Sequence, residues 1–98
     1  MYAVLQRYTF DPASSTELNH QVKDGFVPLL RAAPGFVAFY WFDSSDGTGA
    51  GLSVFENQDS AEAFLERTAD FVREHLAARV GQPEVINGEI TAHAHCGL

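Results

Sequence analysis

The sequence predicts an α+β domain in which one four-stranded antiparallel sheet carries two helices on one face. Three observations favour this fold class: four segments have strand composition, two segments between them have apolar residues at helical spacing, and a tight hairpin joins two halves of similar length. The order strand, helix, strand, strand, helix, strand is the ferredoxin-like βαββαβ arrangement. With 98 residues and 46% hydrophobic content, the chain is expected to form a single domain over residues 1–98.

The first half begins with a strand expected over residues 2–10, which are rich in β-branched, aromatic and aliphatic side chains, and a turn at 11–12 closes it. Ser14 and Glu17 have the spacing of a capping box, so we expect the first helix to begin near Ser15. Apolar residues then follow at helical spacing, namely Leu18, Val22, Phe26, Leu29, Leu30 and Ala33.

Pro28 lies inside this helical pattern. Because proline removes a backbone donor from the helix, we expect a kink or a restart around Val27 and Pro28. The helix should end at residues 33–35, where Ala, Pro and Gly follow one another.

The second expected strand, residues 36–42, is apolar on both of its alternating faces. Asp46 and Gly47 are a strong hairpin signal, and residues 48–56 form the third expected strand, whose glycines make its start weak or bulged. A sheet face that carries several aromatic side chains is larger than the apolar patch a monomer usually exposes. We therefore expect a second copy of the chain to cover the open face of the sheet in a homodimer.

The second helix is expected to be capped by residues 59–62 and to end at 81–83, where Gly, Gln and Pro follow one another. Its apolar stripe consists of Ala61, Phe64, Leu65, Phe71, Val72, Leu76 and Val80. Residues 84–95 then alternate between a polar and an apolar face, which predicts a fourth strand over that length.

Charge and cysteine content exclude several classes of function. Six Lys and Arg against thirteen Asp and Glu give a net charge of −7, so neither nucleic acid nor an anionic membrane surface is an expected partner. Cys96 is the only cysteine, so the chain forms no internal disulfide and a reducing cytoplasm is the simpler location. No apolar run approaches transmembrane length.

Four short segments stand out for their order along the chain: Pro34-Gly35-Phe36, Val54-Phe55-Glu56, Glu62-Ala63-Phe64 and Glu84-Val85. Together they resemble the antibiotic biosynthesis monooxygenase-like domains of the dimeric α/β-barrel superfamily, and the resemblance covers nearly the whole chain. The resemblance implies a dimer whose two sheets pack face to face, with a ligand cleft in each subunit between its sheet and its helices. It also implies relatives of several kinds, including cofactor-independent quinone-forming oxygenases and haem-degrading monooxygenases.

The haem-degrading branch of these domains has an asparagine on the first strand, a tryptophan on the second helix and a histidine near the end of that helix. Here the first position falls near Gln6, the second near Phe64 or Arg67, and only His75 lies close to the third. Two of the three signature residues are absent, which disfavours haem oxygenation, although His75 could still be a ligand.

His75 is the first candidate for chemistry. At 100° per residue it falls inside the apolar stripe of the second helix, so we expect it to point at the sheet. Two interpretations stay open: a core or cleft-edge histidine with one hydrogen-bonded ring nitrogen, or an acid-base residue that removes a phenolic proton from a substrate. Deprotonation is the step that cofactor-free oxygenation requires, because a phenolate gives an electron to dioxygen more readily than a phenol does.

Other polar and aromatic residues are candidates for a ligand-binding cleft, and aromatic residues at strand spacing are also typical of cores and interfaces. The candidate cleft residues are Gln6, Tyr8, Tyr40, Trp41, Thr68 and Phe71. His93 and His95 have the spacing of a metal-chelating pair, but a chain terminus is a poor place for a metal site, and we predict none.

The sequence thus predicts a homodimeric protein similar to the cofactor-independent monooxygenases, without a cofactor, acting on a small aromatic or polyketide-like compound. A non-catalytic small-molecule-binding or structural dimer of the same fold is the alternative. Haem binding or degradation is a further alternative.

Overall fold

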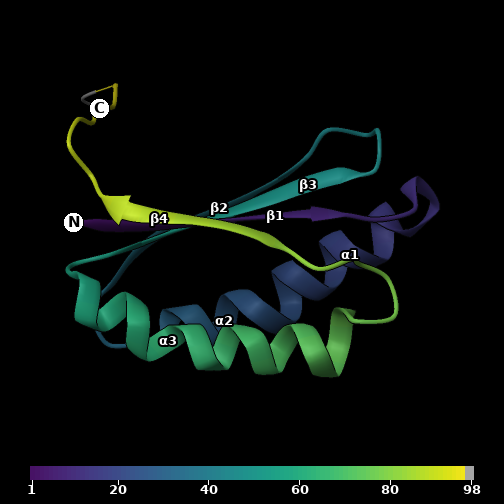
Figure 1. Ribbon diagram of the computed structural model, residues 1–98, viewed down its shortest axis with the longest axis horizontal. Helices are drawn as coiled ribbons and strands as arrows, with labels where there is room; N and C mark the ends of the chain where they lie inside the picture. The colour runs from purple at the N-terminus through teal and green to yellow at the C-terminus, as the bar shows by residue number, and fades with distance from the viewer. Residues whose placement is uncertain (97–98) are drawn as a thin grey trace.

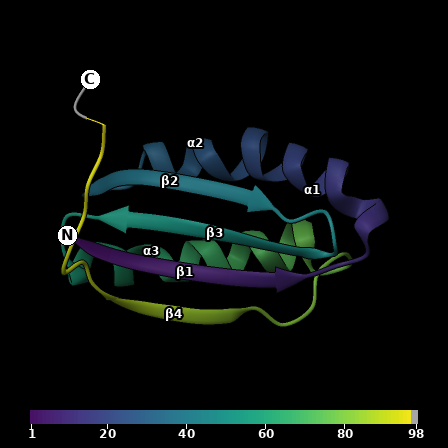
Figure 2. The same ribbon diagram turned by 90° about the horizontal axis from the view of Figure 1, so that it is seen from above.

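The computed structural model describes residues 1–96 and has two layers, a four-stranded sheet and a pair of helices on one of its faces (Figure 1). All strand pairs are antiparallel, in the order β2-β3-β1-β4, as Figure 2 shows from above. The expected ferredoxin-like α+β fold is therefore confirmed. The strands are β1 Tyr2–Thr9, β2 Phe36–Asp43, β3 Thr48–Phe55 and β4 Glu84–Glu89.

Each of the two helices contains a π-helical segment. A 3₁₀ turn, Pro12–Ser14, leads into α1 Ser15–Gln21, the π-helical segment Val22–Phe26 and α2 Val27–Arg31. After β3 come α3 Gln58–Phe71 and the π-helical segment Val72–Leu76. The expected interruption near Pro28 is confirmed, and it takes the form of this first π-helical segment.

The first π-helical segment follows from the spacing of the buried residues. Leu18, Val22, Phe26 and Leu30 are all buried and lie four residues apart. An α-helix has 3.6 residues per turn, so a repeat of four drifts off the buried face unless part of the helix is wound more loosely. Pro28 lies in the first turn of α2, where its missing N–H is harmless.

Both expected helix caps differ from those in the structure. Ser14 makes no side-chain capping bond, and instead the Asp11 carboxylate accepts a hydrogen bond from the Ala13 N–H at 3.0 Å. The second helix begins after Asn57, whose side-chain oxygen accepts from the Ser60 N–H at 2.9 Å, and not after Asp59. The 3₁₀ turn and α3 both start earlier in the chain than the sequence pattern indicates. The capping residues are therefore Asp11 and Asn57, whose short side chains reach the first backbone N–H groups.

A β-bulge in β2 corrects the expected division of this strand into two faces. The pairing with β3 shifts between Phe36 and Ala38, so Phe36 lies on the same face as Phe39 and Trp41, against the helices. Tyr40 and Phe42 lie on the open face and are 63% and 59% exposed. A bulge inserts one residue into a strand and so reverses the alternation on one side of it.

The fourth strand is shorter than expected, ending at Glu89 instead of His95. Its partner is β1, which begins at Tyr2, and Tyr2 pairs with Glu89. One further backbone bond joins the Ile90 N–H to the Met1 carbonyl at 2.8 Å. Residues 91–96 pair with no neighbouring strand, and Figure 1 shows them leaving the sheet on the side away from the helices.

The open face of the sheet is apolar across all four strands. One row of paired residues crosses it from β2 to β4, in the order Tyr40, Leu52, Leu5 and Ile86. Tyr40 and Ile86, at the two ends of this row, are 63% and 68% exposed. The adjacent row ends in Arg7 and Glu84, the charged residues of this face nearest to its apolar centre. We call this surface the open face below.

Candidate functional site

A narrow cavity of about 20 Å³ lies between the sheet and the two helices. Both π-helical segments contribute to its wall, Val22 and Phe26 from the first and Val72 and Leu76 from the second. π-Helical segments are frequent at functional sites. The remaining lining residues are Gln6, Tyr8, Phe39, Trp41, Gly51, Ser53, Thr68 and Phe71.

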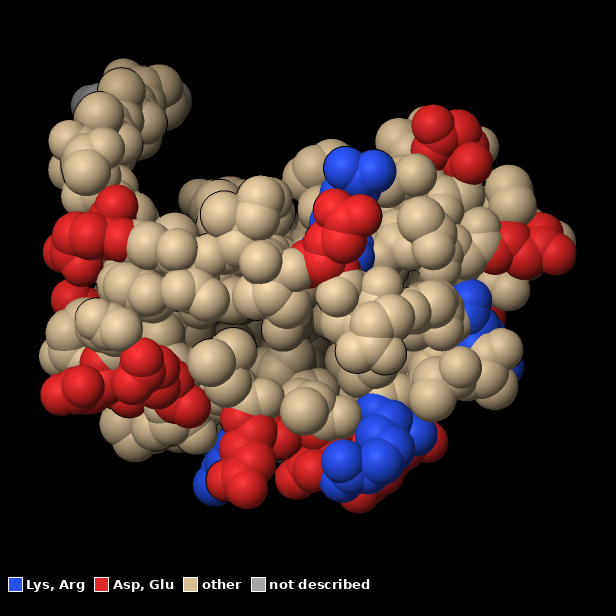
Figure 3. Space-filling model, viewed as in Figure 1, with Lys and Arg blue, Asp and Glu red and all other residues tan. Residues whose placement is uncertain are grey.

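A larger groove of about 620 Å³ lies beside the narrow cavity, between α3 and the segment that leads into β4. The hollow in the middle of the face in Figure 3 lies in this region, and the surface around it is mostly uncharged. Gln6, Tyr8, Thr68 and Val72 line both spaces and so form the boundary between them. The groove has the volume of a small-molecule site, whereas the narrow cavity holds about one water-sized molecule.

Gln6 and Tyr8 supply the polar contact at this boundary. They are two residues apart on β1 and therefore point to the same side of the sheet. The Tyr8 hydroxyl donates a hydrogen bond to Gln6 Oε1 at 2.9 Å. Burial raises the pKa of Tyr8 to about 12, so its hydroxyl keeps its proton at neutral pH and acts as a donor. Gln6 accepts through its oxygen, which leaves its two amide N–H donors for a bound molecule.

Trp41 joins the cavity wall to the first helix. Its ring lies 6.0 Å from the Tyr8 ring, centroid to centroid, and its indole Nε1–H donates to Asn19 Oδ1 at 2.7 Å. On the other side of the cavity the Thr68 hydroxyl donates to the Phe64 carbonyl at 3.3 Å. These two hydrogen bonds orient the Trp41 and Thr68 side chains, and they use the Trp41 indole hydrogen and the Thr68 hydroxyl hydrogen.

Gly51 forms part of the cavity floor and Gly49 lies next to it on β3, a feature that the sequence interpretation missed. Gly49 and Gly51 lie on the helix side of β3, paired with Tyr8 and Gln6 without any shift in register. A Cβ at Gly49 would come within 2.9 Å of Trp41, and one at Gly51 within 3.2 Å of Phe39, so both aromatic rings rest on bare backbone. The expected bulge at the start of this strand is therefore wrong. Glycines two residues apart in a strand indicate a hollow on one face, and that signal was present in the sequence.

Five of the six expected cleft residues lie together in the structure, and Tyr40 does not. Gln6, Tyr8, Trp41, Thr68 and Phe71 all line the narrow cavity. Tyr40 is on the open face, because it alternates with Phe39 and Trp41 along β2. The sequence could not decide which parity faces the helices, since both are aromatic.

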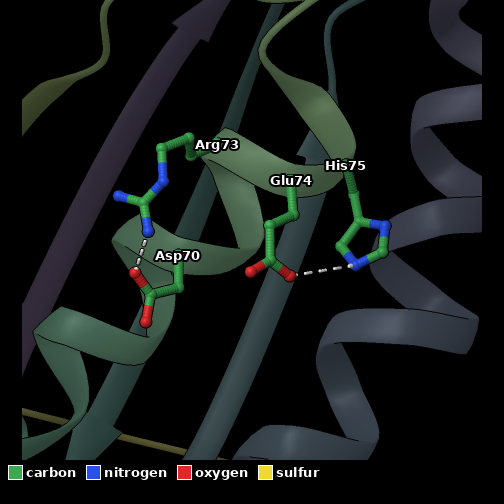
Figure 4. A network of polar contacts seen from close by, with 4 residues as sticks. All are labelled: Asp70, Arg73, Glu74 and His75. Carbon is green, nitrogen blue, oxygen red and sulfur yellow. Dashed lines mark hydrogen bonds and ion pairs between the residues drawn. The ribbon is translucent and has the colours of Figure 1, made fainter.

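The expected placement of His75 is wrong. Its side chain is 48% exposed, its ring packs on Phe71 at 4.7 Å between centroids, and its Nε2 lies 3.9 Å from the Glu74 carboxylate. In Figure 4 the ring turns toward Glu74, and the adjacent Arg73 pairs with Asp70. The cause is the second π-helical segment, which rotates less per residue than an α-helix, so that Leu76, not His75, is the buried residue that follows Phe71 and Val72.

The histidines of the C-terminal segment do not form a metal centre with other side chains. His93 and His95 are exposed, and their rings stack with centroids 6.3 Å apart. Within residues 1–96 there is no group of three or more His, Cys, Asp and Glu side chains that could hold a metal ion. Cys96 is exposed and carries a free thiol.

The site therefore consists of a narrow cavity with aromatic walls and a groove lined mostly by aliphatic and small residues, with a few directed polar groups between them. Among the residues that line the cavity and the groove, Tyr8 and Arg73 are the ones with an ionisable side chain. Such a groove fits an aromatic ligand whose ring packs against apolar side chains and whose oxygen atoms accept hydrogen bonds from the free amide N–H groups of Gln6. A base that takes a proton from the ligand is not among these lining side chains.

Comparison with known proteins shows which solved structures share this fold. The chain matches no model of a protein family, and no characterised protein matches its sequence. Among solved structures it is similar to the monooxygenase ActVA-Orf6 of Streptomyces coelicolor in complex with nanaomycin D, with a TM-score of 0.79, 19% identity and coverage of 98% of this chain and 92% of that one. It is also similar to SnoaB of Streptomyces nogalater, a cofactor-independent oxygenase, with a TM-score of 0.71, 15% identity and 94% of each chain covered.

A third similar structure is a MhuD variant with two manganese protoporphyrin IX bound per active site, with a TM-score of 0.75, 12% identity and coverage of 98% of this chain and 100% of that one. At these identities the likeness concerns the fold. The resemblance to antibiotic biosynthesis monooxygenase-like domains is confirmed at that level. None of the helices in the described part of the chain is long and apolar enough to cross a membrane.

Proposed function

We propose that this protein binds a small aromatic or polyketide-like compound in the groove beside α3 and oxygenates it without a cofactor. The observation that carries this proposal is the groove itself, which is about 620 Å³ in volume and opens onto the Gln6–Tyr8 pair. The similar folds of ActVA-Orf6 and SnoaB support the oxygenase part of the proposal.

The proposed reaction balances with dioxygen as the oxidant. A CH₂ group flanked by aromatic rings becomes a C=O group, one atom of O₂ enters the product, and the other leaves as water with the two hydrogens of the carbon. The carbon gives up the four electrons that dioxygen accepts. An ionised ring hydroxyl would supply the first electron, and the amide N–H groups of Gln6, whose oxygen is held by Tyr8, would donate a hydrogen bond to the oxygen that becomes negative.

Non-catalytic binding of the same class of compound is the second candidate. It is favoured by the lining of the two spaces, in which the ionisable side chains are Tyr8 and Arg73. Neither is a base at neutral pH, so the substrate would have to lose its proton to water at the open end of the groove. Oxygen uptake separates the two candidates.

We also propose that the protein is a homodimer in which two open faces pack together. The row of Tyr40, Leu52, Leu5 and Ile86 is a continuous apolar strip, and single-chain proteins rarely expose such patches over more than a few hundred Å². A reducing, cytoplasmic location fits a chain whose one cysteine, Cys96, is an exposed free thiol.

The single tryptophan gives a direct test of binding. Trp41 lines the narrow cavity, so nanaomycin D bound in the adjacent groove should quench its fluorescence in a saturable way. Oxygen consumption with dithranol, a dihydroxyanthrone with a CH₂ group between its rings, tests turnover. Saturable quenching without oxygen uptake would favour the non-catalytic candidate. A quenching signal that rises linearly with nanaomycin D and does not saturate would overturn both.

A further inference from the structure

The narrow cavity and the groove have different sizes and linings, which indicates different occupants. We propose that the narrow cavity is a binding site for dioxygen, next to the aromatic compound in the groove. Its role as an oxygen site rests on the proposed function, whereas its ability to hold a small apolar gas does not.

Size is the first argument. A cavity of about 20 Å³ accepts one molecule of the size of water or dioxygen and is too small for an aromatic ring. The groove of about 620 Å³ accepts an aromatic compound. Two molecules of these sizes are the two substrates of the proposed reaction.

The chemistry of the wall is the second argument. Most of the cavity surface comes from aromatic and aliphatic side chains, which are Val22, Phe26, Phe39, Trp41, Phe71, Val72 and Leu76. The Tyr8 hydroxyl, the Trp41 indole and the Thr68 hydroxyl all donate their hydrogens to other protein groups. The Gln6 amide and the Ser53 hydroxyl are the other polar side chains of the wall, and the rest of its side-chain surface is apolar, which suits a small apolar occupant.

The position of the cavity is the third argument. Gln6, Tyr8, Thr68 and Val72 form both the inner wall of the groove and the outer wall of the cavity. A molecule in the cavity is thus separated from a ring in the groove by single side chains. Small movements of Gln6 and Tyr8, whose mutual hydrogen bond is 2.9 Å long, would bring the two into contact.

Relaxation of methyl NMR signals under dissolved oxygen tests the proposal directly, because paramagnetic O₂ speeds the relaxation of nearby nuclei. We expect a strong effect at the methyl groups of Val22 and Leu76, which line the cavity. Leu18 and Leu30 are matched controls, since both are completely buried and neither lines the cavity. Equal effects at the four residues would overturn the proposal, because they would show oxygen entering the core without preference.

Filling the cavity floor gives the second arm of the test. In Gly51→Ala the new Cβ lies 3.2 Å from Phe39 and should displace the occupant, so the oxygen effect at Val22 and Leu76 should fall several-fold. Gly88→Ala is the matched control, since nothing lies within 4 Å of its new Cβ. An unchanged oxygen effect in Gly51→Ala would contradict the proposal.

Titration of both variants with nanaomycin D separates this proposal from the proposed function. The proposal is supported if both variants bind nanaomycin D with an affinity within about twofold of the parent while only Gly51→Ala loses the oxygen effect, because the gas site is then separate from the groove. Absence of nanaomycin D binding in a parent protein that keeps the oxygen effect would overturn the proposed function and leave a gas-binding cavity.

Discussion

The hydroxyl of Tyr8 donates a hydrogen bond to the side-chain oxygen of Gln6 at 2.9 Å, between two residues that share one face of β1. This pair lines both the narrow cavity and the groove, and so determines which polar groups a bound molecule meets. The first two predictions concern it.

Ionisation of Tyr8 should destabilise the protein at high pH. Burial raises its pKa from 10.0 to about 12, so the unfolded chain loses this proton at lower pH than the folded chain does. The contribution of the protonated Tyr8 side chain to the free energy of unfolding is complete below pH 10 and is lost as the pH rises from about 10 to about 12. A shift of this size corresponds to roughly 2–3 kcal/mol of unfolding free energy. Urea unfolding across that range should show the loss in the parent and a smaller pH dependence in Tyr8→Phe; the same slope in both proteins would contradict it.

Replacing Gln6 by leucine should weaken ligand binding. Gln6→Leu keeps a similar volume, removes the amide donors, and leaves the Tyr8 hydroxyl without its acceptor. We expect nanaomycin D to bind about ten-fold more weakly, which corresponds to roughly 1.4 kcal/mol. Trp41 fluorescence measures the affinity. Gln58→Leu, on the exposed first turn of α3, is the control, and a Gln6→Leu protein that binds like it would disprove a polar contact at this position.

Adding a methyl group at Gly25 should disturb the cavity wall. The new Cβ would lie 2.9 Å from Cε2 of Phe71, whose ring would have to move. Overpacking costs about 1–3 kcal/mol, and alanine recovers up to about 1 kcal/mol of helix propensity, so Gly25→Ala should lose roughly 1 kcal/mol in urea unfolding. A variant as stable as the parent would show that the Phe71 ring has free space to move into.

A charge on the open face should produce monomers. Tyr40→Asp and Ile86→Asp each place a carboxylate at one end of the apolar row, where burial against a second sheet would leave it without a partner. Sedimentation should show the parent as a dimer at micromolar concentration and both variants at 10.7 kDa. Glu66→Ala, on exposed surface of α3, should stay dimeric. A monomeric parent would disprove the dimer.

His75 should be dispensable for binding in the groove. Its imidazole faces Glu74 and Phe71 outside the residues that line the cavity and groove, so His75→Ala should bind nanaomycin D with the affinity of the parent. Titration of the parent with haemin tests haem ligation separately, and no Soret shift is expected if His75 makes only its contacts to Glu74 and Phe71. A Soret shift that disappears in His75→Ala would instead support haem ligation by this residue.

The sequence by itself determined the order of the elements and much of the site. Alternation along β1 placed Gln6 and Tyr8 on one face, and helical spacing placed Thr68 and Phe71 toward the sheet, because such patterns depend only on the geometry of a regular element. Pro28 likewise marked the region where the first helix departs from α-helical winding.

Only the tertiary structure decided the features that depend on irregularities or on neighbouring strands. One residue added in a π turn moved His75 out of the buried stripe, and one added at the β2 bulge changed which aromatic residues share a face. The fourth strand ends at Glu89, which pairs with Tyr2, the first residue of β1. Periodicity assumes a constant rotation per residue. One additional residue reverses the faces of a strand and turns the following side chains of a helix to a different side, and packing of the core decides where that residue is added.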